Sequence, residues 1–285
     1  MTKEAVKLAH ALEYLRVLSI AGSDSGGGAG IQADLKTFAA LGCYGMTAIT
    51  ALTAQNTLGV RAIHGVPPQM LRDQIDAVLE DIGAHAVKIG MLHAPGIVQT
   101  VAQAIDRHAL QKVVLDPVMV ATSGAVLIDN PAIMMLVREL FPRALVVTPN
   151  LDEASLLVGR PLTSESDMEA AAQEMLTMGA NAVLLKGGHL PGDLVCDLLL
   201  TKEDTHHWMR APRIHTSNTH GTGCTLSSAI AAHLASGASL LDAVQAARDY
   251  VRAALEAGAE VRTGSGGGPL NHGHAPLPMR LKPLR

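Results

Sequence analysis

Aromatic side chains are scarce in this sequence, which limits the ligands it can bind. Phe, Trp and Tyr together make up only 2% of the 285 residues. Few rings are therefore available to stack on nucleic-acid bases. The formal net charge of −4 also gives no basic footprint for a polyanion. We expect a small-molecule ligand and no nucleic-acid partner.

Cysteine and histidine patterns that hold disulfide frameworks or metal ions are missing as well. The three cysteines, Cys43, Cys196 and Cys224, are far apart and form no C-x-x-C pair, and the 13 histidines include no H-E-x-x-H. Neither a disulfide scaffold nor a thiolate zinc site is indicated. This cysteine usage is typical of a reducing compartment, so we expect a cytoplasmic location.

No stretch has the character of a membrane span. The uncharged run 37–60 is interrupted by glycines and by Gln55 and Asn56, which are costly in lipid. We interpret this run as a helix end, a turn and a buried strand. Residues 1–15 carry charges such as Glu13 among apolar positions, which argues against a secretory signal and predicts a short amphipathic helical extension.

Short apolar runs alternate with longer segments of helical periodicity. Strands are predicted over 16–22, 45–54, 85–92, 112–118, 144–150 and 181–188, with shorter pieces at 193–200 and 206–212. Helices are predicted over 31–41, 67–82, 95–108, 151–158, 166–178, 225–236 and 240–257, and glycines 42, 83, 159 and 179 stop four of them. The alternation predicts an α/β fold whose mainly parallel sheet is covered by helices on both faces.

The chain is interpreted as one domain with two appendages. Residues 16–261 carry the alternating pattern, and 1–15 form the extension. The segment 262–285 is rich in glycine and proline, so we expect it to be poorly ordered and without chemistry.

A glycine-rich segment follows the first strand. Gly28, Gly30 and Ala33 formally satisfy G-x-G-x-x-A, which leaves a dinucleotide-dependent oxidoreductase open as an alternative. Against it, Gly28 lies several residues past the strand, and no acidic residue closes the next strand. No lysine follows the glycines, so a Walker phosphate loop is excluded. We interpret the segment as a flexible loop that lets the backbone approach a ligand.

A second loop leads directly into a helix. Gly221, Thr222 and Gly223 precede a periodic segment, so backbone N–H groups and the helix N-terminus can point at one anion. This arrangement predicts an anion hole, and Cys224 lies in its first turn. The alternative is an ordinary N-cap made by Thr222 or Thr225.

Oxygen-bearing side chains follow two other strands. Asp116 ends one strand, while Asn150 and Glu153 open the helix after the next and share one of its faces. Carboxylates at strand ends beside an anion hole suit Mg²⁺. Asn150 and Asp152 could instead simply cap that helix. Lys186, at a further strand end, offers a positive charge near phosphates.

These segments together resemble a known enzyme family. The resemblance depends on seven segments, which occur in order between about residues 16 and 260: AGSDSGGGAGIQADLKTF, TALTAQNT, KIGML, LDPVMVATSG, TPNLDEA, LKGGH and THGTGCTLSSAIAA. They resemble the hydroxymethylpyrimidine/phosphomethylpyrimidine kinases of thiamine biosynthesis, within the ribokinase superfamily. The resemblance implies a three-layer αβα sandwich, ATP, Mg²⁺, a homodimer, and two successive phosphorylations of an aminopyrimidine alcohol.

The resemblance also implies roles for individual residues. The pyrimidine pocket is expected to include Gly22, Asp34, Gln55, Met91 and Val118. Asp116 and Glu153 are expected near Mg²⁺, Asn150, Lys186 and Thr222 near the nucleotide, and Gly221, Thr222, Gly223 and Cys224 around the transferring phosphoryl group. Gln55 is supported independently, because a carboxamide presents a donor and an acceptor side by side to an aminopyrimidine edge.

Cys224 stands where sugar kinases of this superfamily typically have an aspartate base. A phosphate monoester is already an anionic nucleophile and needs no base, while a nearby carboxylate would repel it by several kcal/mol at intermediate dielectric. We therefore hypothesise that the thiol removes this repulsion. We also expect the helix N-terminus to lower its pKa toward neutrality, so that it assists the first step.

Three alternatives to this activity remain. A pyridoxal or pyridoxine kinase is the nearest, because some members that closely resemble the family accept that ring. The others are the dinucleotide-dependent oxidoreductase and a catalytically silent ligand-binding regulator.

Overall fold

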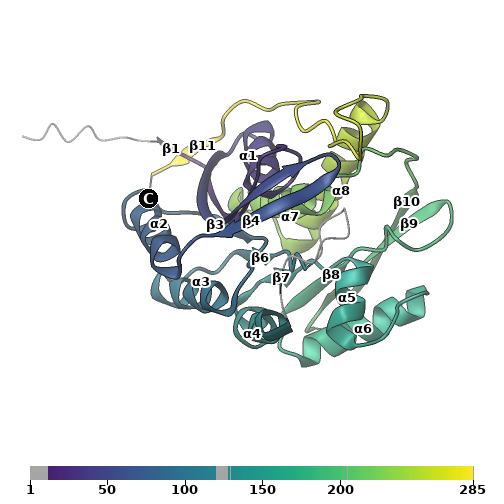
Figure 1. The fold of residues 1–285 in the computed structure, drawn as a ribbon, viewed down its shortest axis with the longest axis horizontal. Helices are drawn as coiled ribbons and strands as arrows, with labels where there is room; N and C mark the ends of the chain where they lie inside the picture. Colours follow the sequence, from purple (N-terminus) through teal and green to yellow (C-terminus); the bar gives the residue numbers. More distant parts are fainter. Residues whose placement is uncertain (1–11, 120–127, 129, 204, 285) are drawn as a thin grey trace, which may run out of the picture.

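A mainly parallel sheet forms the middle layer of the protein (Figure 1). The computed structural model describes residues 12–119, 128, 130–203 and 205–284. The strands of this sheet are β2 (Arg16–Asp24), β3 (Tyr44–Asn56), β4 (Gly59–Gly65), β5 (Ala86–Ile89), β6 (Val113–Leu115), β7 (Val146–Val147), β8 (Ala182–Leu185), β9 (Leu194–Thr201) and β10 (His206–Pro212). Their order is β10-β9-β8-β7-β6-β5-β2-β3-β4. The six central strands from β8 to β3 run parallel, and β4, β9 and β10 pair antiparallel at the edges.

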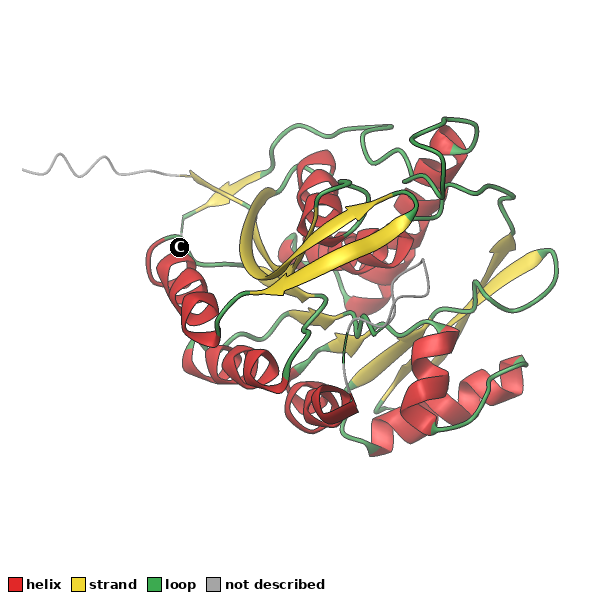
Figure 2. Ribbon diagram, in the orientation of Figure 1, coloured by secondary structure: helices red, strands yellow, loops and turns green. Residues whose placement is uncertain are grey.

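Helices cover both faces of the sheet (Figure 2). One face carries α1 (Gly30–Ala40), α7 (Thr222–Ala235) and α8 (Leu240–Gly258). The other carries α2 (Pro68–Asp81), α3 (Pro95–Arg107), α4 (Asn130–Leu140), α5 (Leu151–Val158) and α6 (Glu165–Thr177), with a short 3-10 turn at Phe141–Arg143. The predicted three-layer αβα sandwich is confirmed.

Strand β6 shows how the sheet separates the two cores. Val113 and Leu115 point into the core beneath α2 to α6, while Val114 points into the core beneath α1, α7 and α8. Alternate side chains of a strand face opposite sides, so a strand buried on both faces must be apolar throughout. This is why the central strands read as continuous apolar runs.

The predicted glycine stops are confirmed. Gly42 and Gly83 both have φ of 73°, Gly159 has 70° and Gly179 has 113°. These values lie in the left-handed region, where a Cβ is disfavoured.

Some elements differ from the prediction. Helix α4 and strand β4 were not predicted, and α7 begins at Thr222, three residues before its expected start. Of the expected helical extension, residues 1–11 lie outside the described part of the chain. Residues Leu12–Tyr14 form strand β1, which pairs antiparallel with β11 (Leu281–Pro283), so the helical prediction is wrong there.

The C-terminal segment is packed on the domain, so the expected poor order is wrong. Leu270 is 3% exposed and His272 5%. The Leu277 amide donates to the Ala40 carbonyl at 2.8 Å, and the Arg280 amide donates to Gly42 at 2.7 Å. Glycine and proline predict loop here, but the backbone hydrogen bonds and a few apolar side chains are enough to dock it.

Within the described residues, no helix combines the length and the apolar character needed to cross a bilayer.

Candidate active site

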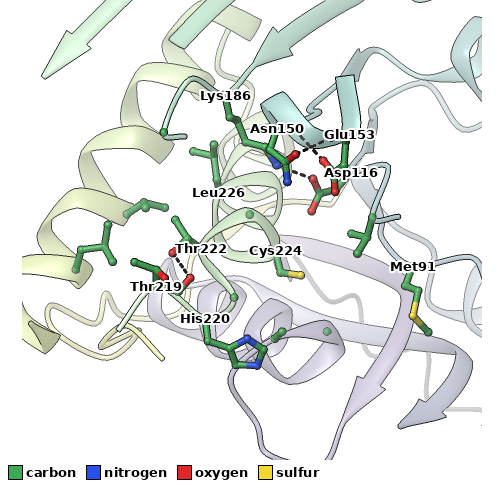
Figure 3. Close-up of a pocket in the computed structure, with 18 of the residues that line it drawn as sticks. Met91, Asp116, Asn150, Glu153, Lys186, Thr219, His220, Thr222, Cys224 and Leu226 are labelled. Carbon is green, nitrogen blue, oxygen red and sulfur yellow. Dashed lines mark hydrogen bonds and ion pairs between the residues drawn. The ribbon is translucent and has the colours of Figure 1, made fainter. Parts of the chain in front are cut away.

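A cavity of about 700 Å³ opens where the parallel strands end (Figure 3). Ligands of open α/β sheets bind at the carboxyl ends of the strands, as the sequence analysis assumed. The cavity is lined by these predicted site residues: Gly22, Gln55, Met91, Asp116, Val118, Asn150, Glu153, Lys186, Gly221, Thr222, Gly223 and Cys224. Asp34 is the exception, because its carboxylate lies behind the wall and is fully buried.

Helix α7 points its uncapped N-terminus into the cavity. Gly221 is the N-cap residue, with φ of 82°, and it has no side chain to cap the helix. The Thr222 hydroxyl donates to the Thr219 carbonyl at 2.6 Å, and the Thr225 hydroxyl donates to the Gly221 carbonyl at 2.8 Å. Neither hydroxyl therefore caps an amide, and the simple N-cap alternative is wrong. The positive end of the helix is left to an anion.

Cys224 lies in this first turn with its sulfur toward the cavity (Figure 3). Burial raises the pKa of its thiol to about 11. The positive charge of Lys88 opposes this, and the negative charges of Asp34 and Asp116 add to it. The expectation of a pKa near neutrality is therefore wrong, because burial outweighs the helix N-terminus. The thiol stays uncharged at neutral pH.

Asp116 and Lys186 form an ion pair at the cavity wall. Lys186 Nζ lies 3.0 Å from Asp116 Oδ1, and the Thr148 hydroxyl donates to the same oxygen at 3.0 Å. Burial alone would raise the pKa of Asp116. The positive charges of Lys186 and Lys88, with these hydrogen bonds, instead hold it below its usual value. Asp116 is therefore an anion in the free protein.

Asn150 and Glu153 hold each other in a capping box. The Glu153 amide donates to Asn150 Oδ1, and the Asn150 amide donates to Glu153 Oε2, each at 2.8 Å. The capping role considered for Asn150 is confirmed, whereas Asp152 is exposed and pairs with His189 at 2.9 Å. Burial raises the pKa of Glu153 to about 7; Lys186 opposes the rise, and the charge of Asp116 adds to it.

These carboxylates fit a divalent cation. Asp116 and Glu153 both lie near one ammonium group, that of Lys186. The raised pKa of Glu153 indicates that a further positive charge would be favourable. No group of three His, Cys, Asp or Glu suited to a metal occurs in the described chain. Mg²⁺ commonly binds through one or two carboxylates and completes its shell with water and substrate phosphates.

The glycine-rich loop is held by Asp24, a residue that the sequence analysis missed. Its carboxylate accepts from the amides of Gly26 at 2.7 Å, Gly28 at 3.0 Å and Ala29 at 2.8 Å. It also lies 3.1 Å from His220 Nε2. The expected flexible loop is therefore fixed. Asp24 is the last residue of β2, so the strand-end rule could have found it.

This loop lies against the turn that begins α7. A Cβ on Gly221 would lie 1.8 Å from the Gly28 carbonyl oxygen, and one on Gly28 would lie 2.3 Å from the His220 ring. The glycine-rich loop was expected to let the backbone approach a ligand closely. In the structure its backbone lies this close to the turn that begins α7.

Gln55 faces the same turn. Its Oε1 accepts from the Thr53 hydroxyl at 3.1 Å, and its Nε2 lies 3.3 Å from His220 Nε2. These contacts fix the orientation of the carboxamide. Thr53 and His220 were not predicted. Thr53 is two residues before Gln55 in the same strand, a spacing that places side chains on one face, whereas His220 is 165 residues away and gives no signal.

Asp34 forms a fully buried ion pair with Lys88. Lys88 Nζ lies 2.9 Å from Asp34 Oδ1 and 3.0 Å from Oδ2. The hydroxyls of Ser19 and Ser228 donate to the same carboxylate at 2.5 and 2.7 Å. Lys88, which was not predicted, lines the cavity in place of Asp34.

Comparisons with known proteins agree on one family. Residues 24–271 match phosphomethylpyrimidine kinase. The chain is 52% identical over 258 residues to a hydroxymethylpyrimidine/phosphomethylpyrimidine kinase of Rhizobium meliloti, covering 90% of this chain and 96% of that protein. It is 44% identical over 265 residues to the Escherichia coli protein of the same name, covering 93% and 99%.

Solved structures share the fold. A phosphomethylpyrimidine kinase from Clostridium difficile superposes with a TM-score of 0.73 and 42% identity, over 84% of this chain and 98% of that one. A pyridoxal kinase from Staphylococcus aureus, in complex with AMP-PCP and pyridoxal, gives 0.84 and 35%, over 92% and 94%. These matches show a kinase family, so the alternative of a dinucleotide-dependent oxidoreductase is wrong. The chain belongs to the phosphomethylpyrimidine kinase family.

Proposed function

We propose that this protein phosphorylates 4-amino-5-hydroxymethyl-2-methylpyrimidine with ATP and then phosphorylates the monophosphate to the diphosphate, in thiamine biosynthesis. One observation carries the proposal. In a chain of this family, the uncapped first turn of α7 opens into the same cavity as Gln55 and the Lys186–Asp116 pair. A binding site for an anion and a polar handle for an aminopyrimidine therefore face each other.

The first turn of α7 supports phosphoryl transfer. The amides of Gly223 and Cys224 and the positive end of the helix open into the cavity, where they would stabilise the charge that develops on a transferring phosphoryl group. Phosphoryl transfer depends mainly on positioning and electrostatic stabilisation, which fixed backbone donors supply without reorganising.

The nucleotide side is assigned to Lys186, Asn150 and Thr222. The ammonium of Lys186 is held by Asp116 at the cavity wall, where it can balance phosphate charge. Asp116 and Glu153 would hold Mg²⁺, which supplies Lewis-acid stabilisation of phosphate oxygens when it is bound.

The pyrimidine side is assigned to Gln55 with Gly22, Met91 and Val118. A carboxamide has two donor hydrogens and two acceptor lone pairs. Thr53 lies against the oxygen and His220 against the nitrogen, and the carboxamide keeps an acceptor lone pair and N–H donors for the ring. Met91 packs closely over Gly22, where an added Cβ would lie 2.7 Å from the Met91 methyl group.

A coupled assay with ATP tests the proposal. Purified protein is given the pyrimidine alcohol, then its monophosphate, then pyridoxal, and ADP release is followed. Turnover of both pyrimidines supports the proposal. Turnover of pyridoxal alone would instead support the pyridoxal kinase alternative, whose S. aureus representative shares the fold.

The homodimer implied by the family resemblance and the cytoplasmic location indicated by the cysteine usage are part of the same proposal. Size-exclusion chromatography with light scattering tests the dimer. A mass equal to one 29.7 kDa chain at micromolar concentration would contradict it.

A further inference from the structure

Two serine–aspartate–lysine sets lie side by side along α7. The Ser227 hydroxyl donates to Asp116 Oδ2 at 3.3 Å, and Asp116 pairs with Lys186. The next residue, Ser228, donates to Asp34, which pairs with Lys88. Ser227 and Ser228 lie one helical turn after Gly223 and Cys224, so each set is anchored directly behind the anion-binding turn. Only the Lys186 set has a role in the proposed function.

The Lys88–Asp34 pair is oriented with its positive end toward the cavity. Lys88 lines the cavity and Asp34 does not, although both side chains are fully buried, and the carboxylate is satisfied by Ser19 and Ser228. Gly90 makes room for the ammonium, because a Cβ there would lie 2.8 Å from Lys88 Nζ. A neutral pair oriented in this way still presents a positive potential to a ligand close to its ammonium.

The Lys88 ammonium is charged. Burial opposes the charge, but the carboxylate of Asp34 outweighs burial and holds the pKa of Lys88 above its usual value. The pair is fully buried, so solvent and salt screen it little.

Lys88 lies on the pyrimidine side of the cavity. It is in β5, which pairs with β2, the strand that carries Gly22, and Met91 follows β5 directly. Lys186 lies on the other side, where its backbone bridges to Asn150. The two lysines therefore come from different strands of the sheet, and the positive charges of both act on Asp116.

We propose that Lys88 is a specificity-determining residue for the second phosphorylation, its buried positive charge stabilising the phosphate of the monoester substrate beside Cys224. This inference rests on the proposed function. The first substrate is a neutral alcohol and gains little from a buried positive charge, whereas the second carries a phosphate. With an uncharged thiol at Cys224, no negative side chain stands between Lys88 and that phosphate in the turn.

The test compares KM for the alcohol and for its monophosphate in three variants. Lys88→Met removes the charge at similar length but leaves Asp34 buried and unpaired. The double variant Asp34→Asn/Lys88→Met removes both charges, so it keeps a neutral core and protects the fold. We expect KM for the monophosphate to rise about tenfold or more relative to KM for the alcohol in both variants. Calorimetric titration with each pyrimidine gives the same ratio without turnover.

Arg248→Met/Asp197→Asn is the matched control. Arg248 and Asp197 form another buried ion pair that lines the same cavity, with 2.8 Å between Arg248 Nε and Asp197 Oδ2. Loss of this pair should change both KM values by a similar factor. An unchanged KM ratio in the Lys88 double variant would overturn the inference while leaving the two-step activity standing. A wild-type protein inactive on both pyrimidines would overturn the proposed function, and this inference with it.

Discussion

The thiol of Cys224 lies next to the amides that we propose bind the transferring phosphoryl group. Its raised pKa means that this position carries no charge at neutral pH. An uncharged side chain interacts only weakly with a neutral alcohol and with an anionic phosphate. It therefore suits a site that must accept both nucleophiles.

Cys224→Asp should separate the two steps. Two like charges about 4 Å apart at an effective dielectric near 20 repel by about 4 kcal/mol, so we expect the second phosphorylation to lose about a hundredfold or more in kcat/KM. The first step should lose much less, because its substrate is uncharged. Steady-state assays with each pyrimidine measure the two losses. Cys224→Ala, which adds no charge, is the control and should slow both steps by similar factors. Equal losses in the aspartate variant would show that charge repulsion does not explain the thiol.

At the scale of single residues, the sequence predicted the position of the candidate site better than it predicted which residues contact one another there. Asp116 and Lys186 could be placed together because each follows a strand, and the ends of parallel strands meet at one edge. Lys88 and Asp34 are 54 positions apart, and each lies within an element. Nothing local in the sequence marks such a pair, so Lys88 was missed, and Asp34 was expected to face the ligand from the family resemblance alone.

At the scale of elements, the first turn of α7 depends on Gly221. A residue with a Cβ would be strained at its φ of 82°, and the Cβ would collide with the carbonyl oxygen of Gly28. The helix, the glycine-rich loop and the anion hole therefore depend on one position.

Gly221→Ala should reduce both stability and activity. We expect a loss of unfolding free energy of about 1 kcal/mol from the left-handed backbone alone, and more from the collision. Gly237→Ala is a matched control. Gly237 lies beyond the other end of α7 with φ of 93° and nothing near its added Cβ, so it carries only the backbone strain. Urea unfolding and the coupled assay compare the two variants. If Gly221→Ala lost no more stability and activity than Gly237→Ala, packing against Gly28 would not define the turn.

Element prediction succeeded where local signals were strong. Each glycine stop adopts the left-handed conformation that makes glycine the preferred residue after a helix. No element was predicted between residues 118 and 144, so helix α4 (Asn130–Leu140) was missed although Pro131 lies near its start. Strand β7 is only Val146–Val147, much shorter than the apolar run 144–150, since Pro149 has no amide to donate to a ladder.

At the scale of the whole molecule, the C-terminal segment joins the active-site elements. The His220 amide donates to the Gly268 carbonyl at 3.1 Å. His272 Nε2 lies 3.0 Å from the hydroxyl of Thr225 in α7, and the Tyr250 hydroxyl donates to the His272 carbonyl at 2.7 Å. A segment that composition alone marks as a loose tail therefore supports the first turns of α7.

His272 should make this docking pH-dependent. Burial and the charge of Lys36 together lower the pKa of His272 to about 4, whereas the unfolded chain titrates near 6.5. Between these values the unfolded state binds more protons, so stability falls as the pH drops below about 6.5. Linkage gives a loss of about 2 kcal/mol in unfolding free energy between about pH 7 and pH 5 from this residue.

His272→Gln isolates that contribution, because an amide can still hydrogen bond to Thr225 but does not titrate. Other, partly buried histidines such as His233 also have lowered pKa values, so the wild-type and variant proteins must be compared at each pH. We expect urea unfolding to show a smaller stability loss in the variant, by about 2 kcal/mol, on going from about pH 7 to pH 5. The C-terminal segment should also become more susceptible to proteolysis at low pH in the wild type than in the variant. Parallel pH profiles for the two proteins would mean that His272 is not buried in solution, and that the segment is docked less tightly than its contacts with α7 indicate.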